Sequence, residues 1–357
     1  MKRNRLLFSL LIALAGCTVF LQCTRCSPLT ETKLAQQQLT LVSYNTQTFF
    51  DAIEDGSEFK EFKGSKSRWT EQRYRTRLER LKQTMFIAGE KLTGKKEQLP
   101  DIVILQEIEN NRVIEDLCKQ LPNNAGYPYA LCPTFPGKSA FTTVILSKYP
   151  IESFRVHHLY TEKPLSLRPL TEALINTGSK EHPRLLTVFA VHWKSKSGAA
   201  ESASVRALQE SQLINKIREH TAKRPQIPFL VCGDFNQPLE EFKDLNTLDV
   251  CWNTEEYLSE TENGRQPKGS YYFKNSWEKI DHIFYVGKSY FDSYEDTDDN
   301  NTDYDGYKGN VYIEPNAFFV LYEPPLIDNG KPVRYNVLTG EGYSDHLPLG
   351  FRFKIRN

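Results

Sequence analysis

Short apolar runs recur along the chain, and polar, turn-forming stretches separate them. These runs include LTLVSYN, DIVILQE, TTVILSKYPI, LLTVFAVHW, IPFLVCGDFN and KIDHIFYV. Each is rich in Val, Ile, Leu or Phe and has the length of a buried strand. The residues from Leu347 to Ile355 instead alternate apolar and polar side chains, as a half-buried strand does. The pattern predicts a β-strand at each of these places.

Helical spacing appears between the strands. Apolar residues recur every three or four positions from Tyr74 to Leu92. Thr70 stands where an N-cap is expected, and Gly94 where the helix should end. A shorter helix is predicted after DIVILQE, and another from Ser204 to His220. Strands interspersed with helices indicate an α/β layered domain.

The N-terminal residues have the pattern of an export signal. A basic start, MKRNR, precedes an apolar run from Leu6 to Leu14 and the tetrapeptide LAGC. LAGC resembles the lipobox of bacterial lipoproteins, in which the cysteine, here Cys17, carries the lipid that holds the protein to a membrane. We therefore predict a signal peptide over residues 1–16, a polar tether over 17–38 and a domain over 39–357, in the bacterial cell envelope outside the cytoplasm. The alternative is an uncleaved anchor, although the apolar run is shorter than the ~20 residues that a span needs.

Composition excludes some classes of protein. The 45 basic and 45 acidic side chains give a net charge of zero, so any affinity for phosphate must come from a local site. With 39% hydrophobic and 12% aromatic residues, the chain can bury a core. The domain's cysteines are widely separated and form no zinc-ligand spacing, and their pairing stays open; they are Cys118, Cys132, Cys232 and Cys251.

A set of polar residues stands where the predicted strands end or begin: Asn45, Glu107, His192, Asp234, Asn236, Asp281, Asp345 and His346. One such aspartate alone is usually a turn former. A set at the ends of neighbouring strands would instead converge on one cleft. Oxygen ligands suit Mg²⁺ or Mn²⁺, and imidazoles donate hydrogen bonds to phosphate or move a proton. Cleavage of a phosphate ester needs these parts.

The motifs together resemble those of the endonuclease/exonuclease/phosphatase superfamily, which includes secreted DNases and abasic-site nucleases. SYNTQTFFD, ILQEIENNRVIEDL, TTVILSKYPI, RPL, VHWKSKSG, CGDFNQP, KIDHIFY and YSDHLPL stand in the order of that superfamily, from Leu39 to Phe353. GDFN, SDHLP and the strand-terminal QE are its specific features. The resemblance implies an α/β four-layer sandwich, in which two mixed β-sheets pack face to face with helices on both outer faces.

The resemblance also implies a metal site. Glu107 would be the principal ligand of the cation, with Asn45 and Asp345 near the same ion. Relatives often have an acid at the position of Gln47, which helps to hold a metal-bound water, and often have Asn at the position of Thr48. An amide is a weaker ligand, so we expect one metal ion. The segment from Asp292 to Asn310 faintly resembles a calcium loop but lacks its bidentate Glu, which favours a solvated insertion over structural Ca²⁺.

Catalytic roles follow from the same matching motifs. Asp234 would activate or position the attacking water, and Asn236 would hold that water or the phosphate. His346 would lie beside the scissile phosphate, with Asp281 as its orienting acid. Phosphate contacts are implied for His192, Arg168 and Asn45. Whether the aspartate or the His–Asp pair is the base stays open. His282 should point to the opposite strand face and is interpreted as structural.

The leading hypothesis is an exported, metal-dependent phosphodiesterase that acts on nucleic acid and is a monomer. One alternative keeps the mechanism but takes a phospholipid or a sugar or inositol phosphate. Another is a surface lipoprotein that binds without turnover. Trp69, Arg73, Arg75 and Trp193 are candidates for a groove that follows a nucleic-acid backbone, although WTEQRYRTRL also fits the solvated face of a helix.

Overall fold

The computed structural model describes residues 37–122, 126–133, 139–159, 167–196, 199–254, 267–290 and 311–356. The predicted signal peptide, most of the tether and the Asp292–Asn310 segment lie outside the described residues. None of the helices in the described ranges is long and apolar enough to cross a membrane. The four cysteines of the domain are free thiols.

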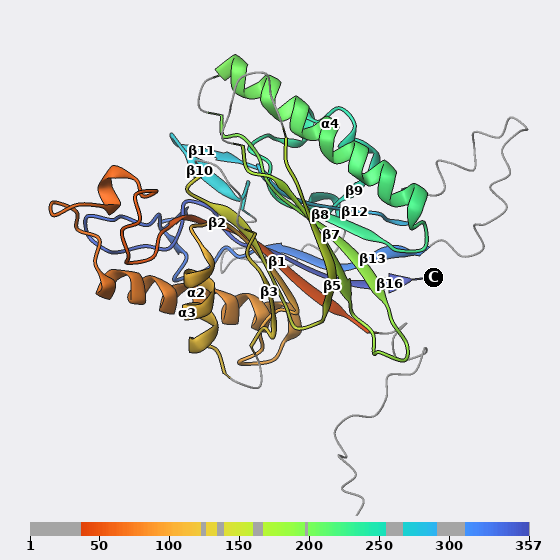
Figure 1. Cartoon of the computed structure of the whole chain (residues 1–357), viewed down its shortest axis with the longest axis horizontal. Helices are drawn as coiled ribbons and strands as arrows, with labels where there is room; N and C mark the ends of the chain where they lie inside the picture. Colours follow the sequence, from red (N-terminus) through yellow and green to blue (C-terminus); the bar gives the residue numbers. More distant parts are fainter. Residues whose placement is uncertain are drawn as a thin grey trace, which may run out of the picture.

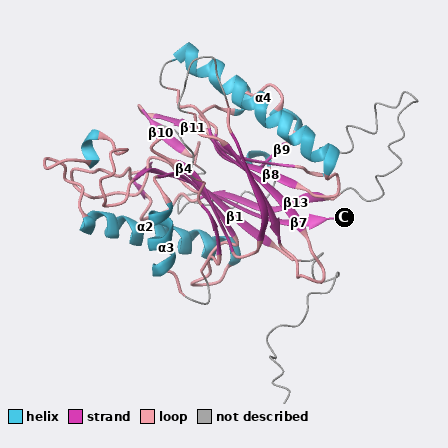
Figure 2. Cartoon of the chain, in the orientation of Figure 1, coloured by secondary structure: helices cyan, strands magenta, loops and turns pink. Residues whose placement is uncertain are grey.

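Two six-stranded β-sheets form the centre of the molecule (Figures 1 and 2). In spatial order, sheet A consists of β13 (Tyr312–Val320), β16 (Leu349–Arg356), β1 (Leu39–Phe49), β2 (Ile102–Ile108), β4 (Thr142–Ser147) and β3 (Tyr129–Leu131). Sheet B consists of β5 (Ile151–His157), β6 (Leu170–Asn176), β7 (Leu185–His192), β8 (Phe229–Asp234), β12 (Asp281–Tyr285) and β9 (Asp249–Val250). Both sheets are mixed, because β1 runs parallel to β2 and β7 parallel to β8, while the other pairs are antiparallel.

Helices cover the two outer faces. Helices α2 (Glu71–Thr93) and α3 (Asn111–Gln120) lie on sheet A, and α4 (Ala199–Lys223) lies on sheet B (Figure 1). The hydroxyl of Thr70 accepts a hydrogen bond from the N–H of Arg73, and Gly94 ends α2 with a φ of 68°. The predicted cap and stop of this helix are therefore confirmed, as is the predicted four-layer sandwich.

Smaller elements connect the layers. They are the 3-10 helices η1 (Lys60–Phe62), η2 (Leu239–Glu241), η3 (Leu245–Thr247) and η4 (Cys251–Asn253), and two hairpins, β10 (Tyr271–Phe273) with β11 (Ser276–Glu278) and β14 (Ile327–Asp328) with β15 (Lys331–Pro332).

The alternation of side chains along the strands of sheet B divides the core in two. On β8, Leu230 and Cys232 belong to the cluster between the sheets, whereas Val231 belongs to the cluster under α4. Leu213 and Ile217 of α4 supply the other side of that second cluster. Strands β7 and β8 are buried on both faces, which is why their sequences are almost continuously apolar.

One predicted strand is in fact two strands in different sheets. TTVILSKYPI contains β4, which ends at Ser147 in sheet A, and the start of β5 at Ile151 in sheet B. Pro150 lies in the turn between them and cannot donate to a sheet ladder. Strand β5 is an exposed edge strand, so it lacks the apolar pattern that marks the strands predicted from the sequence.

His282 lies on the face of β12 that points away from Asp281 and is fully buried. Its Nε2 lies 2.9 Å from the backbone oxygen of Gln237, and the indole N–H of Trp252 lies 3.1 Å from its Nδ1. Because an indole N–H only donates, Nδ1 must accept, and the ring is held neutral. Burial lowers the pKa of His282 to about 4.

This buried imidazole should make the fold sensitive to acid. The unfolded chain takes up the proton of His282 near pH 6.5, before the folded chain does, so stability that is present above that pH is lost as the pH falls toward 4. The loss should reach about 3 kcal/mol at pH 4. In urea denaturation, His282→Gln should be less stable than the wild type at pH 7.5, and the difference should shrink by that amount at pH 4. A difference that does not change with pH would contradict the assignment.

Candidate active site

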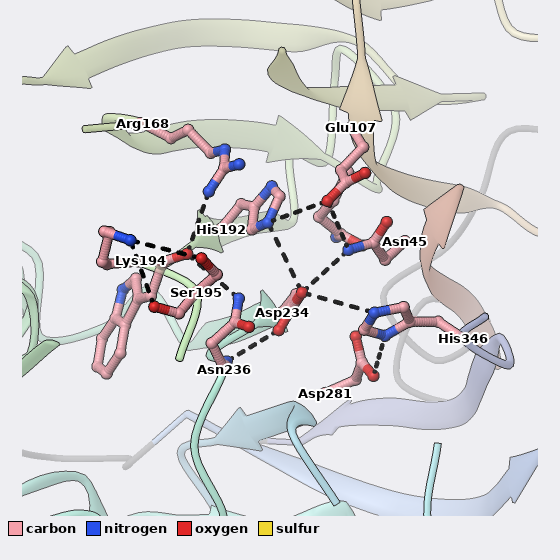
Figure 3. Close-up of polar contacts among 12 residues, drawn as sticks. Asn45, Glu107, Arg168, His192, Lys194, Ser195, Asp234, Asn236, Asp281 and His346 are labelled. Atoms are coloured by element: carbon pink, nitrogen blue, oxygen red, sulfur yellow. Dashed lines mark hydrogen bonds and ion pairs between the residues drawn. The ribbon is translucent and has the colours of Figure 1, made fainter. Parts of the chain in front are cut away.

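The polar strand ends meet at one end of the two sheets, around an open cavity of about 790 Å³ (Figure 3). The predicted site residues that line it are Glu107, Arg168, His192, Asp234, Asn236, Asp345 and His346. Asn45 and Asp281 are hydrogen-bonded to residues of this lining. All the predicted site residues are therefore brought together.

Strand register explains the convergence. His192 at the end of β7 is the partner of Asp234 at the end of β8, and Asp281 at the start of β12 is its partner on the other side. Asn45 on β1 pairs with Gln106 on β2, which places Glu107 one residue further along. The two sheets pack face to face, so these two groups of strand ends face each other.

Asp234 occupies the centre of the site. Its Oδ2 accepts a hydrogen bond of 2.9 Å from Nδ2 of Asn45, and its Oδ1 one of 2.8 Å from the backbone N–H of Asn236. The Nε2 atoms of His192 and His346 lie 3.6 and 3.9 Å from Oδ2. Burial, and then the charge of Asp281, raise the pKa of Asp234 to about 7.

His346 is held by an acid and a hydroxyl. Its Nδ1 lies 2.8 Å from Oδ2 of Asp281, and the hydroxyl of Ser270 donates to the same oxygen at 2.6 Å. This pair fixes the ring so that Nε2 faces Asp234. Burial lowers the pKa of His346, but the charge and hydrogen bond of Asp281 outweigh it and raise that pKa to about 10.

His192 stands in a different environment. Its Nε2 lies 3.7 Å from Oε1 of Glu107 and 3.6 Å from Oδ2 of Asp234. Burial, and then the charge of Arg168, hold the pKa of His192 well below its usual value. Arg168 is itself fixed by a hydrogen bond of 3.2 Å to the backbone oxygen of Trp193. The cavity thus has a cation beside a neutral imidazole at one side, and the His346–Asp281 pair at another.

A bulge at the end of β1 positions Asn45 and Glu107. The register between β1 and β2 shifts there, and Gln47 and Thr48 have φ angles of 56° and 48°. In this conformation the N–H of Gln47 donates to Oδ1 of Asn45 at 2.9 Å, and the N–H of Thr48 donates to Oε2 of Glu107. Glu107 itself has a φ of 62°.

Arg77 of α2 holds this bulge from behind. Its guanidinium donates to the carbonyl oxygens of Thr46, at 2.7 Å, of Gln47, and of Thr48, at 2.8 Å. The rings of Phe49 and Tyr335 lie 4.5 and 4.0 Å from its Cζ. Burial lowers the pKa of Arg77 to about 10. Arg77 is not predicted from the sequence, because one arginine on an amphipathic helix gives no signal of burial.

The donor chemistry of the site fits a divalent cation. Glu107 and Asp345 present carboxylate oxygens to the cavity, and Asp234 adds a third negative group. Asn45 directs its Nδ2 at Asp234 and Glu107, 2.9 and 3.5 Å away, and its Oδ1 at the N–H of Gln47. In this arrangement the Nδ2 of Asn45 donates to the carboxylates and its Oδ1 accepts from Gln47. The side-chain oxygen of Asn45 therefore does not face the carboxylates, as the predicted role of a metal ligand would require. Glu107 and Asp345 would hold the ion.

Among the described residues, two groups of side chains bring possible metal ligands together, one in the site and one outside it, formed by Asp55, Glu58 and Glu109. In the site, one ligand atom from each of Asp234, Asp281 and His346 lies within 4.8 Å of the others, but the contact between Asp281 and His346 is already a hydrogen bond.

Gln47 is not turned to the cavity centre, because its amide exchanges hydrogen bonds of 3.1 and 3.0 Å with the backbone of Tyr335.

The predicted backbone-tracking groove is wrong. Trp193 is only 3% exposed and packs against Phe235 and Phe242, because it follows His192 and points to the opposite face. Arg73 donates to the backbone of the 337–338 segment, and Arg75 forms an ion pair with Glu71. None of the proposed groove residues lines the described cavity.

Two further residues that line the cavity, Arg334 and Tyr271, are not predicted from the sequence. Arg334 lies 3.2 Å from Oδ2 of Asp345, and the ring of Tyr271 lies 4.6 Å from that of His346. Tyr271 begins the short strand β10 and Arg334 follows the short strand β15, and neither segment has an apolar periodicity. Only Tyr271 had a usable signal, since it lies in a run of three aromatic residues just before KIDHIFY.

The chain belongs to the Endonuclease/Exonuclease/phosphatase family, whose model matches residues 40–354. A search of curated proteins finds no match.

Solved structures with the same fold share little sequence with the chain. A truncated Caenorhabditis elegans TDP2 is 15% identical, with a TM-score of 0.52 over 90% of this chain and 99% of that one. An endonuclease/exonuclease/phosphatase from Bacteroides vulgatus is 14% identical, with a TM-score of 0.54 over 90% and 100%. A D. rerio TDP2 complexed with single strand DNA product is 16% identical, with a TM-score of 0.50 over 89% and 99%.

Removal of the Arg77 guanidinium should lower the stability of the fold. Arg77→Met leaves three backbone carbonyls without their donor, and each unsatisfied buried group costs about 1–3 kcal/mol. We expect the free energy of unfolding, from urea titration, to fall by at least about 3 kcal/mol. Arg75→Met, on the exposed face of the same helix, should change it by less than about 0.5 kcal/mol. Equal effects of the two substitutions would show that Arg77 does not hold the bulge.

Proposed function

We propose that the protein is a metal-dependent phosphodiesterase that hydrolyses nucleic acid by attack of water on phosphorus. The observation that carries this proposal is the convergence of Glu107, Asp234, His192 and the His346–Asp281 pair on one open cavity. Membership of the family supports the class of reaction.

The charges around the cavity suit a phosphate diester. Arg168 and Arg334 both line it and offer guanidinium donors to phosphate oxygens. Asn236 lies near Arg168, because its Nδ2 donates at 3.2 Å to the backbone oxygen of Trp193 that also accepts from Arg168. The carboxylates of Glu107 and Asp345 would repel a phosphate unless a cation lies between. A bound Mg²⁺ or Mn²⁺ would neutralise charge on the phosphate as the P–O bond breaks.

The proton transfers follow from the positions of two groups. Asp234 has one oxygen fixed by Asn236 and the other directed at the centre of the site, where it would accept the proton of the attacking water. His346, oriented through Nδ1 by Asp281, would donate from Nε2 to a phosphate oxygen. The bond from phosphorus to the leaving oxygen then breaks, and that oxygen takes a proton from solvent.

Nucleic acid is the substrate class we favour. The cavity is open, and its volume of about 790 Å³ exceeds what one phosphate needs. A fold relative has been solved in complex with a single strand DNA product. The alternative substrates, phospholipids and sugar or inositol phosphates, would use the same chemistry and are separated from nucleic acid by direct assay.

We further propose that the enzyme is exported and held by lipid at Cys17, on the basis of LAGC and the apolar run before it. An anchored diesterase would act on substrates outside the cytoplasm.

Loss of single site residues should abolish turnover and leave the fold intact. His346→Ala and Asp234→Asn should each lower kcat on an oligonucleotide by about 100-fold or more, since each removes a proton-transfer or donor group. EDTA should abolish activity, and Mg²⁺ or Mn²⁺ should restore it. His182→Ala, in an exposed turn, is the matched histidine control and should retain full activity. Retained turnover in His346→Ala and Asp234→Asn, or after EDTA, would exclude this site as the catalytic centre.

The anchor has its own test. In a bacterial host, the full chain should incorporate labelled palmitate and sediment with membranes. Cys17→Ser should abolish both, whereas Cys23→Ser should abolish neither. Labelling that survives Cys17→Ser would contradict lipidation at that position.

A further inference from the structure

One wall of the catalytic cavity is a hairpin whose aromatic side chains take no part in the chemistry proposed above. Strands β10 and β11 pair in register, with Tyr271 opposite Glu278 and Phe273 opposite Ser276. Side chains alternate along a strand, so Tyr271 and Phe273 share one face of β10, and Tyr272 lies on the other.

The Tyr272 face is packed against the body of the protein. The ring of Tyr272 lies 5.2 Å from that of Trp277, which in turn lies 5.8 Å from Tyr322. The ammonium of Lys331 stands 5.1 Å from the centre of the Tyr272 ring. These contacts fix the hairpin from behind and direct its other face to the cavity, which Tyr271 lines.

The aromatic rings of the cavity face form a row that starts at the catalytic imidazole. Tyr271 lies 4.6 Å from His346, with 35° between the ring planes. Phe273 follows at 6.2 Å from Tyr271, with only 20° between their planes, and is 41% exposed. The ammonium of Lys274 stands 5.3 Å from the Phe273 ring and ends the row. We call Tyr271, Phe273 and Lys274 the aromatic row.

Backbone contacts fix the aromatic row to the active site. The N–H of Leu347 donates to the carbonyl of Ser270 at 2.7 Å, and the hydroxyl of Ser270 donates to Asp281, the partner of His346. The two-residue turn is equally defined, because Lys274 and Asn275 have φ angles of 46° and 64°, as in a type I′ turn. Lysine adopts this conformation at a cost, and here it places a cation over an exposed ring.

We propose that the aromatic row is a stacking subsite for the base next to the scissile phosphate of a single-stranded nucleic acid. Near-parallel aromatic faces with flanking cations bind bases and backbone phosphates together. Arg334, whose side chain is 57% exposed, supplies a further cation on the same cavity. Bases of a duplex are stacked within the helix, so only an unpaired base can reach these rings. This inference rests on the proposed function and specifies its substrate class.

The test compares two oligomers that differ only in their bases. One is a single-stranded oligothymidylate, and the other has a base-free tetrahydrofuran unit at every position. Phe273→Ala should lower kcat/KM on oligothymidylate about tenfold, chiefly through KM, and leave the base-free oligomer unaffected. Phe273→Trp should retain activity on both. Phe154→Ala is the matched control, since Phe154 is 55% exposed on edge strand β5, and it should alter neither rate.

Binding without turnover gives the second measurement. In the Asp234→Asn background with Mg²⁺, an oligothymidylate that carries 2-aminopurine should lose fluorescence on binding, and Phe273→Ala should abolish that quenching. If Phe273→Ala affects both oligomers equally, affects neither, or instead lowers hydrolysis of phosphatidylcholine vesicles alone, the subsite is overturned while the proposed chemistry stands. If the wild type cleaves no oligonucleotide, the proposed function falls, and the quenching measurement alone decides whether the row binds bases.

Discussion

The site depends on a strained strand end that a buried guanidinium holds in place. Gln47 and Thr48 adopt left-handed backbone angles, which cost about 1–2 kcal/mol for each residue. Three hydrogen bonds from Arg77 oppose that cost, and bonds to a charged donor are worth about 1.5–3 kcal/mol each. Only in this bulged form do the two N–H groups point at Asn45 and Glu107. In a regular strand these N–H groups would form hydrogen bonds within the sheet. The side chains of Asn45 and Glu107 would then lose the hydrogen bonds that position them.

The second element of the site is set by strand register alone. Asp234 has His192 as its partner on one side and Asp281 on the other, so two sheet ladders bring three titratable groups together without any loop. Placing two carboxylates side by side is unfavourable, and the structure relieves it by pairing Asp281 with His346. The carboxylates of Asp234 and Glu107, which both approach Nδ2 of Asn45, make the centre attractive to a cation. The bulge thus positions Asn45 and Glu107 on sheet A, and the strand register positions His192, Asp234 and Asp281 on sheet B.

Sequence reasoning predicts the parts of this site that obey a local rule. His192 and Asp234 each end a continuous apolar run, and a buried strand that ends in a polar group is visible without a structure. Arg77 is not visible, because its partners lie on another element about 30 positions away and nothing in its own helix marks it as buried. Arg334 is missed for the same reason, as its role comes only from its approach to Asp345. Trp193 was predicted to be exposed but is buried. The sequence does not show that its side chain points to the face of sheet B that α4 covers.

Gln47 connects the bulge at the end of β1 to Tyr335 in the wall of the cavity, and this contact determines whether Gln47 can be a metal ligand. The resemblance to the superfamily implies an acid at this position, which would help to hold a metal-bound water. Here both polar atoms of the amide are engaged by the backbone of Tyr335, whose ring also covers Arg77. An ionised carboxylate has no proton to donate to the Tyr335 carbonyl, so the amide is required for this paired contact. Gln47 is therefore a structural link between bulge and wall. The carboxylates proposed as ligands, Glu107 and Asp345, would suit a single cation whose other positions would be filled by water and substrate oxygens.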